Sequence, residues 1–189
     1  MPISYSALHV AHKFIADNVR PGDICIDATA GRGGDTAFLC ELVGERGKVI
    51  AFDIQQEAID STRALLEKRG LSSIAELHLC SHSLMDEYAA EGTISCITFN
   101  FGWLPGGDHN IFTLPDTSIA AIDKGLRLLK PGGVMSLCIY YGRETGYAER
   151  DALLEHLATI DSDEYAVIVS QFVNRSGCPP IPVSIIKAK

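Results

Sequence analysis

Two acidic residues and the glycine-rich stretch between them are the residues best suited to bind a ligand. Asp27 ends an apolar run and leads into residues 28–34 (ATAGRGG), and Asp53 ends a second apolar run. A glycine-rich turn after a buried parallel strand lies where open α/β sheets bind ligands, because glycine lets a ligand approach the backbone closely. An acid at the end of the next strand accepts hydrogen bonds from both hydroxyls of a ribose. The spacing therefore predicts a site for a nucleoside-containing cofactor.

The two acids also indicate which cofactor this is. S-adenosylmethionine carries a sulfonium and an ammonium but no pyrophosphate, so two carboxylates beside the turn suit its charge. A dinucleotide would gain little from Asp27, and Thr36 stands where the dinucleotide pattern G-x-G-x-x-G has its third small residue. The alternative is structural, with Asp27 capping the turn and Asp53 capping the following helix. We expect S-adenosylmethionine as the cofactor and S-adenosylhomocysteine (SAH) as its product.

Further cofactor contacts are expected from the same edge of the sheet. Ser81 and His82 follow a short predicted strand and would face the adenine, although an ordinary loop role for His82 stays open. The expected cofactor-binding residues are Asp27, Thr29, Ala30, Gly31, Gly33, Asp53, Ile54, Gln55, Ser81, His82 and Asn100.

Asn100 ends the fourth predicted strand, close to the expected sulfonium. Methyl transfer from a sulfonium is an in-line displacement, so the enzyme mainly holds a lone pair in line with the methyl carbon in a dry site. An asparagine carbonyl that accepts a hydrogen bond from an amine aims the nitrogen lone pair in this way. The alternative is that Asn100 only satisfies backbone groups of the loop, with Trp103 filling the core.

The loop after Asn100 is long, polar and rich in glycine and proline, which favours a role in binding the acceptor. An alkylamine must lose a proton before it attacks, and Asp108 is the nearest candidate acceptor in sequence, with His109 and Tyr141 behind it. An ordinary role as surface loop residues stays open for these three. Trp103 is suited to stack on a base. The expected catalytic residues are Asn100, Asp108 and Tyr141, and the expected substrate-binding residues are Trp103, Leu104, Pro105, Gly107, Asp108, His109, Arg143 and Asn174.

Seven strand-like segments alternate with helices until the final pair, which predicts the elements that position these residues. Amphipathic spacing predicts helices over 6–19, 56–69, 117–129 and 148–160, with Asp116 as an N-cap and Gly70 ending the second of these. The pattern predicts a single α/β domain over 1–189, with a Rossmann-like, doubly wound, seven-stranded sheet that is mostly parallel and has an antiparallel C-terminal strand.

The net charge of −8 argues against a protein that grips nucleic acid over a broad surface, because phosphate binding depends on Lys and Arg. A local basic patch would suffice for a short stem-loop, and basic residues of the C-terminal half are available for it: Arg143, Arg150, Arg175, Lys187 and Lys189.

The remaining composition predicts a cytoplasmic protein without a metal. The six cysteines are scattered and contain no C-x-x-C pair, so we expect reduced, buried thiols and no zinc site. No apolar stretch approaches membrane-spanning length, and residues 1–4 lack the basic start of a secretory signal. His9 and His12 lie in the first helix, where solvated helix surface is the expected environment. The sequence leaves the oligomeric state open and is compatible with a homodimer.

Residues 27–36 (DATAGRGGDT) together with Asp53 resemble the cofactor loop of class I S-adenosylmethionine-dependent methyltransferases, and residues 129–133 (LKPGG) are typical of them. Residues 100–108 (NFGWLPGGD) are more narrowly similar to a bacterial family named "putative rRNA methylase", as are residues 141–142 and Asn174 with the two prolines at 179–180. The resemblance implies the class I methyltransferase fold. It also implies N-methylation of 5-aminomethyl-2-thiouridine at the wobble position of tRNA, with the anticodon stem-loop as substrate.

The chain departs from this family at one place, since the family usually has a histidine where Arg143 stands and an acidic pair where residues 149–150 read Glu-Arg. We expect Arg143 to contact phosphate instead. Other functions stay open: a methyltransferase for another RNA site or for a small-molecule amine, a nicotinamide-dependent oxidoreductase, and a non-catalytic cofactor-binding module.

Overall fold

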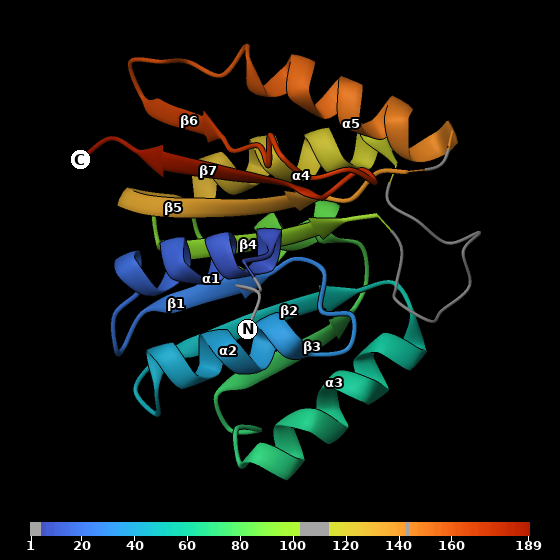
Figure 1. The fold of residues 1–189 in the computed structure, drawn as a ribbon. Helices are drawn as coiled ribbons and strands as arrows, with labels where there is room; N and C mark the ends of the chain where they lie inside the picture. The colour runs from blue at the N-terminus through green and yellow to red at the C-terminus, as the bar shows by residue number, and fades with distance from the viewer. Residues whose placement is uncertain (1–4, 103–113, 143) are drawn as a thin grey trace.

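The computed structural model describes residues 5–102, 114–142 and 144–189. It contains one seven-stranded sheet in the order β3-β2-β1-β4-β5-β7-β6, in which β7 runs antiparallel to both of its neighbours (Figure 1). The strands are β1 (Ile24–Asp27), β2 (Lys48–Asp53), β3 (Ala75–Leu79), β4 (Ile94–Phe101), β5 (Leu129–Ile139), β6 (Tyr165–Val169) and β7 (Ile181–Lys187). The predicted fold class is confirmed.

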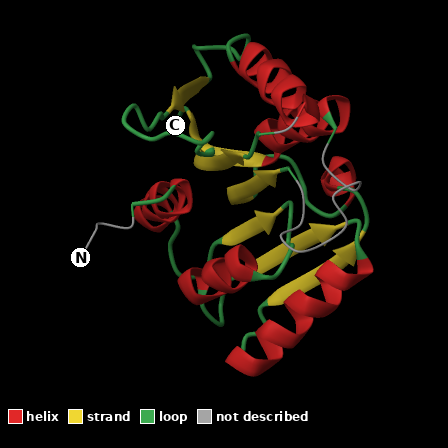
Figure 2. Cartoon of the chain, turned by 45° about the vertical axis from the view of Figure 1, so that its right-hand side comes forward, coloured by secondary structure: helices red, strands yellow, loops and turns green. Residues whose placement is uncertain are grey.

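Helices cover both faces of this sheet (Figure 2). The helices are α1 (Ala7–Asn18), α2 (Gly34–Val43), α3 (Gln56–Arg69), the 3₁₀ helix η1 (His82–Glu87), α4 (Pro115–Leu128) and α5 (Glu144–Leu157). Successive side chains of a strand point to opposite faces, so a central strand feeds two cores. Cys25 belongs to the same core cluster as Ile15 of α1 and Ala37 of α2, whereas its neighbour Ile26 belongs to the cluster that contains Ile122 of α4 and Leu153 of α5.

Local sequence signals fix several of the helix ends. The Ser6 hydroxyl accepts a hydrogen bond from the His9 amide at 3.1 Å and caps α1, and α3 ends at Gly70 with a φ of 70°. The prediction of Asp116 as an N-cap is wrong. Helix α4 begins at Pro115 with Leu114 in the capping position, and Asp116 lies in the first turn, where a carboxylate favours the positive end of the helix dipole.

Strand β5 begins earlier than its sequence suggests. Leu129 pairs with Ile94 of β4 and the pairing resumes at Val134 with Cys96, so residues 130–133 form an irregularity in the ladder between these two pairs. A Cβ atom on Gly133 would lie 2.8 Å from the Lys130 carbonyl oxygen, so glycine is required for this close approach. The Lys130 ammonium then reaches the Asp23 carboxylate at 2.7 Å and fastens the strand to the turn before β1.

The carboxyl ends of the parallel strands form one edge of the sheet, which we call the carboxyl rim. The register pairs Asp27 with Thr98 and Asn100 with Cys138, so the polar ends of β1 and β4 meet there. Because β7 runs in reverse, its first residue, Ile181, pairs with Ile139 at the end of β5. The β6–β7 connection therefore also reaches the carboxyl rim, where open α/β sheets bind their ligands.

Candidate cofactor and acceptor site

Asp27 is fully buried at the end of β1 and organises the glycine loop. One carboxylate oxygen accepts a hydrogen bond from the Thr29 amide at 3.1 Å, and the other accepts one from the Thr36 hydroxyl at 2.6 Å. Burial, reinforced by the negative charge of Asp35, raises the pKa of Asp27 to about 7. A positive charge beside this carboxyl group would offset part of the free-energy cost of ionising it in this buried position.

Two glycines of the loop have left-handed backbone conformations, Gly31 with a φ of 55° and Gly33 with a φ of 83°. A Cβ atom on Gly33 would lie 2.9 Å from the Cα atom of Thr62 in α3. The Thr62 hydroxyl donates to the Gly31 carbonyl oxygen at 3.2 Å. Glycine is thus needed both for the turn and for its packing on α3.

Asp53 at the end of β2 joins the same loop. Its carboxylate accepts hydrogen bonds from the Gly31 amide and the Gln55 amide, each at 2.9 Å. Gln55 is the N-cap of α3, so Asp53 binds the amide of the residue before the helix and is not itself the cap. Each carboxylate oxygen has a second lone pair, so these contacts leave Asp53 able to accept from ribose hydroxyls. The adjacent Ile54 side chain is 58% exposed and offers an apolar surface beside this acid.

His82 and Ser81 lie against the glycine loop at the start of η1. The His82 Nδ1 atom lies 3.2 Å from the Ala28 carbonyl oxygen, which only accepts, so Nδ1 carries the hydrogen. Burial lowers the pKa of His82, which favours the neutral ring. Its Nε2 atom is then an acceptor, and it has no hydrogen-bond partner among the residues that the structure describes.

Asn100 is held by two hydrogen bonds at the end of β4. Its backbone amide donates to the Thr29 hydroxyl at 2.7 Å, and its side-chain Nδ2 donates to Asp35 Oδ2 at 2.7 Å. The other oxygen of Asp35 lies 2.7 Å from His12 Nε2, and the His12 ring stacks on Phe38 with centroids 4.0 Å apart. Because a carboxylate only accepts, Asp35 fixes which end of the Asn100 amide faces it.

Comparison with known proteins identifies the group to which this site belongs. Residues 49–186 match the family model described as "Putative rRNA methylase". The chain belongs to this family.

Individual relatives agree with this assignment. A "tRNA (mnm(5)s(2)U34)-methyltransferase, chloroplastic" from Arabidopsis thaliana is 36% identical over 97% of this chain, which spans 69% of that protein. A "putative rRNA-methylase" from Clostridium thermocellum superposes with a TM-score of 0.95 at 42% identity, covering 97% of this chain and 98% of the other. A "putative methyltransferase" from Streptococcus mutans, solved in complex with SAH, has a TM-score of 0.88 at 34% identity, covering 98% and 99%.

This rRNA methylase family member is an S-adenosylmethionine-dependent methyltransferase, as its relatives indicate. That result confirms the predicted cofactor and disfavours the oxidoreductase and the non-catalytic module. The residues present also fit the cofactor, because the loop offers buried negative charge for a cation and Asp53 keeps free lone pairs for a ribose.

The structure brings some of the predicted site residues together and separates others. The predicted cofactor-binding residues from β1, β2, β4 and the start of η1 meet at the carboxyl rim. Tyr141 lies beyond the end of β5, where the guanidinium of Arg150 sits 4.9 Å from its ring centroid, and Asn174 is exposed on the β6–β7 connection. The other predicted acceptor residues lie outside the described residues: Trp103, Leu104, Pro105, Gly107, Asp108, His109 and Arg143.

The expectation that His12 is solvated helix surface is wrong, and Asp35 was missed as a site residue. Asp35 stands in the first turn of α2, where a carboxylate is favoured by the helix dipole alone, so its type suggested no further role. Its partner Asn100 is 65 residues away in the sequence, and only the packing of α2 beside β4 joins them. Only the combination of three features could have indicated this network: a histidine in the first helix, an acid after the glycine loop and a polar residue at a strand end.

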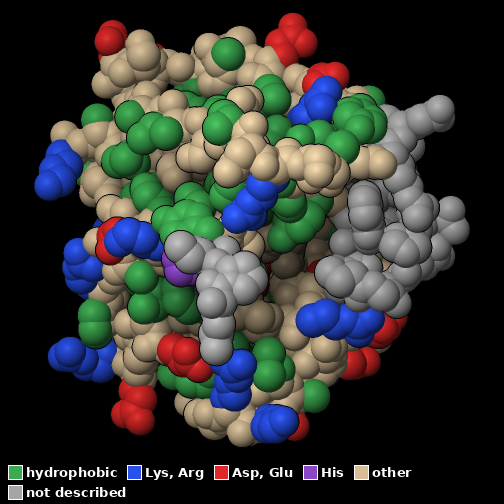
Figure 3. Space-filling view, viewed as in Figure 1, with side chains coloured by type: hydrophobic (Ala, Val, Ile, Leu, Met, Phe, Trp, Pro, Cys, Tyr) green, Lys and Arg blue, Asp and Glu red, His purple; other side chains and the backbone are tan. Residues whose placement is uncertain are grey.

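On the face drawn in Figure 3, the basic side chains of the described residues do not form one broad area. Figure 3 shows Lys and Arg side chains scattered over the visible face. The Lys187 ammonium donates to the Leu129 carbonyl oxygen at 2.9 Å, and Lys189 lies near Gly132, so both lie at the opposite edge from the carboxyl rim. Those two lysines therefore cannot join Arg150 and Arg175 in a patch at the site.

Two surveys of the described residues bear on other site classes. No group of three or more metal-ligating side chains that could hold an ion occurs within the described ranges. In the same part of the chain, no helix is both long and apolar enough to cross a membrane.

Proposed function

We propose that this chain methylates the nitrogen of the 5-aminomethyl group of (2-thio)uridine at the wobble position of tRNA, giving the 5-methylaminomethyl form. Two observations support the proposal. The Arabidopsis relative is named for the corresponding tRNA nucleotide, U34. The carboxyl rim presents an amide suited to orient an amine, and this geometry carries the argument.

The orientation of Asn100 is the observation on which the proposal depends. Asp35 requires the Nδ2 end of the amide, so the Oδ1 end is left to accept a hydrogen bond from the substrate. An amine N–H that donates to this oxygen has its lone pair turned in a defined direction. His12 holds the second oxygen of Asp35 and restrains the carboxylate from rotating. The chain thus supplies positioning, which is the main requirement of an in-line displacement.

The cofactor, when bound, supplies a methyl group on a sulfonium that departs as the neutral thioether of SAH. The amine nitrogen forms the new N–C bond as the C–S bond breaks, and the resulting secondary ammonium loses a proton. Asn100 accepts an N–H of the amine throughout and does not take up this proton. Asp108 and Tyr141 are our candidates for the group that removes a proton from the substrate ammonium before attack.

We assign the cofactor contacts from the hydrogen-bonding capacity and the apolar surface of each side chain. Asp53 accepts from the ribose hydroxyls, and Ile54 packs against the adenine, with His82 Nε2 as an acceptor for its amino group. The glycine loop and Asp27 lie nearest the amino-acid end of the cofactor, where its cationic groups are. The further predicted contacts are Thr29, Ala30, Gly31, Gly33, Gln55 and Ser81.

Mass spectrometry of tRNA nucleosides tests the proposal directly. Purified protein and S-adenosylmethionine are added to tRNA from a strain that lacks the corresponding gene. We expect 5-aminomethyl-2-thiouridine to disappear and its N-methyl form to appear in equal amount. Methyl transfer to free alkylamines but not to this tRNA would support the small-molecule alternative and refute the proposal. Methylation at another nucleotide would refute the assigned position.

A further inference from the structure

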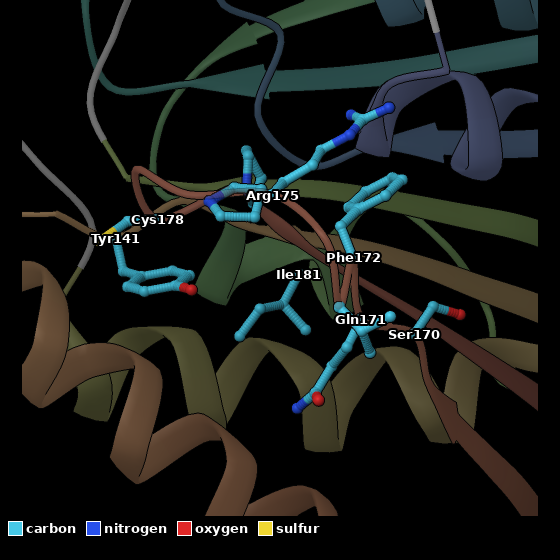
Figure 4. A pocket seen from close by; sticks show the side chains of 10 residues that line it. Tyr141, Ser170, Gln171, Phe172, Arg175, Cys178 and Ile181 are labelled. Atoms are coloured by element: carbon cyan, nitrogen blue, oxygen red, sulfur yellow. The ribbon is translucent and has the colours of Figure 1, made fainter.

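A pocket opens at the carboxyl rim, on the far side of β5 from the glycine loop. It has a volume of about 300 Å³ and is formed by Tyr141 and by the connection that follows β6 (Figure 4). In this view Tyr141 and Phe172 lie on opposite sides of Ile181. The residues that line the pocket are Tyr141, Ser170, Gln171, Phe172, Val173, Arg175, Cys178, Pro179, Pro180 and Ile181.

The sheet register places this pocket beside the acceptor site. Asn100 pairs with Cys138 of β5, and Cys138 pairs with Pro182 of β7. Neighbouring strands lie about 4.8 Å apart, so Pro182 stands roughly 10 Å from Asn100 along the rim. That separation is larger than one pyrimidine ring with an aminomethyl arm can span. A substrate whose amine is at Asn100 would therefore place a neighbouring group in the pocket.

The pocket combines aromatic rings with positive charge. The Arg175 guanidinium lies 4.1 Å from the ring centroid of Phe172. Arg150, whose guanidinium lies 4.9 Å from the Tyr141 ring centroid, is not a lining residue and pairs with Asp151, so the positive charge of the pocket is that of Arg175. Within the described part of the chain, no carboxylate lines the pocket or pairs with Arg175. Bases stack on aromatic rings and on guanidinium planes, and phosphates attract the same guanidinium groups.

This chemistry distinguishes between the possible acceptors. A small alkylamine is a cation at neutral pH and would be repelled by Arg175, with no acid in the pocket to attract it. A nucleotide brings both a flat base and a negative phosphate. The amide of Gln171 and the hydroxyl of Ser170 add donors and acceptors for the edge of a base. An acid-free pocket is notable in a chain with a net charge of −8.

We propose that this pocket binds the base of a nucleotide that flanks the methylated one in the RNA substrate, stacked on the Phe172–Arg175 pair. The inference rests on the proposed tRNA methyltransferase function and extends it to a second recognition site. The occupied pocket fixes the register of the RNA loop, so that the wobble nucleotide and not its neighbour presents its amine to Asn100.

Two substitutions test the pocket without removing its packing. Phe172→Leu keeps an apolar side chain against Ala7 and Ala11 of α1, whereas Arg175→Gln keeps a polar, hydrogen-bonding side chain without the charge. Arg69→Gln is the matched control, because Arg69 is an exposed arginine that pairs with Glu41 away from the rim. Stacking of one base is worth enough that we expect each pocket variant to raise the dissociation constant for RNA by about 5- to 100-fold. Affinity for SAH should stay unchanged.

The RNA probe is an anticodon stem-loop oligonucleotide with 5-aminomethyl-2-thiouridine at the wobble position. Two further versions lack the base on one side or on the other. With wild-type protein, we expect one abasic version to bind as weakly as the intact RNA binds to Phe172→Leu. Combining that version with the variant should add little further loss, because both changes remove the same contact.

The outcomes separate this inference from the proposed function. If the wild-type protein methylates the intact oligonucleotide and both pocket variants bind it as tightly as Arg69→Gln does, the pocket inference alone is refuted. The same conclusion follows if the losses from the variant and the abasic version are additive on both sides. If the wild-type protein transfers no methyl group to this oligonucleotide or to tRNA, the proposed function and the pocket inference fall together.

Discussion

Replacing Asp35 tests whether the buried carboxylate positions the Asn100 amide for catalysis. In Asp35→Ala, Asn100 Nδ2 and His12 Nε2 both lose the partner that each contacts at 2.7 Å. The amide is then free to rotate and to present Nδ2 to the amine, which also donates, so that the two groups no longer pair. The hydrogen bonds of Asp53 and Thr62 to the glycine loop do not involve Asp35, which acts on this loop only through its charge near Asp27.

The expected magnitude follows from the type of contact that is lost. A hydrogen bond to a charged group contributes about 1.5–3 kcal/mol. If that energy holds the amide in its productive orientation, kcat falls by about 10- to 150-fold, because each 1.36 kcal/mol of barrier is a factor of ten. Asp35→Asn keeps an acceptor oxygen without the charge, so we expect a smaller loss of about 5- to 10-fold.

Single-turnover methyl transfer to tRNA, measured with SAH binding by calorimetry and thermal unfolding, separates positioning from folding. Glu41→Ala is the control, because Glu41 is an exposed acid on the same helix and pairs with Arg69 at the surface. We expect the control to match wild type and Asp35→Ala to lose kcat while it keeps its affinity for SAH. A folded Asp35→Ala protein with a wild-type kcat would refute the positioning role. So would a loss in kcat that is matched by an equal loss in affinity for SAH.

Three further predictions concern the cofactor loop. Asp53→Ala should weaken SAH binding by about 10- to 100-fold, since it removes a charged acceptor, and calorimetry that shows unchanged affinity would contradict the ribose assignment. Gly33→Ala should lower the free energy of unfolding by about 1–3 kcal/mol, because its φ is 83° and the new Cβ atom would lie 2.9 Å from the Thr62 Cα atom. Denaturant titration measures this loss. Gly22→Ala is the control, because Gly22 also has a positive φ but its Cβ atom would meet no neighbour. The pKa of Asp27 lies at about 7 in the folded protein, above its ordinary value of 3.8, so the folded state binds the extra proton between these values. The free energy of unfolding should therefore decrease as pH rises through this range, by at most about 1.4 kcal/mol per pH unit, and Asp27→Asn should flatten this dependence. An equally steep slope in that variant would assign the effect to another group.

The sequence was informative where the physical cause is local. Strands and helices follow from the spacing of apolar residues, and the glycine loop follows from small residues placed after a buried strand. The bounds of α3 could be predicted because Gly70 ends it in a left-handed conformation. The start of β5 at Leu129 could not, because residues 130–133 have turn-forming types and interrupt the pairing with β4 between Leu129 and Val134.

The polar network around Asn100 shows more clearly what could not be predicted from the sequence. Asn100 was predicted as a site residue because it stands at the end of a strand. Nothing local distinguishes His12 from an ordinary surface histidine, because its role depends on Asp35 and on Phe38, which packs beside it. Such a network joins α1, α2 and β4, so it becomes visible only when the three elements are placed in space.

The reversed direction of β7 separates the residues proposed to bind the acceptor from those proposed to bind the methyl donor along one edge of the sheet. Because that strand starts where its parallel neighbours end, the segment before it lies at the carboxyl rim, two strands away from β4 and its Asn100. Lengthening or rewriting that segment would alter which acceptor is admitted while the donor half stays intact. An architecture of this kind allows acceptor specificity to change through the sequence of a single peripheral loop while the methyl-transfer site is kept.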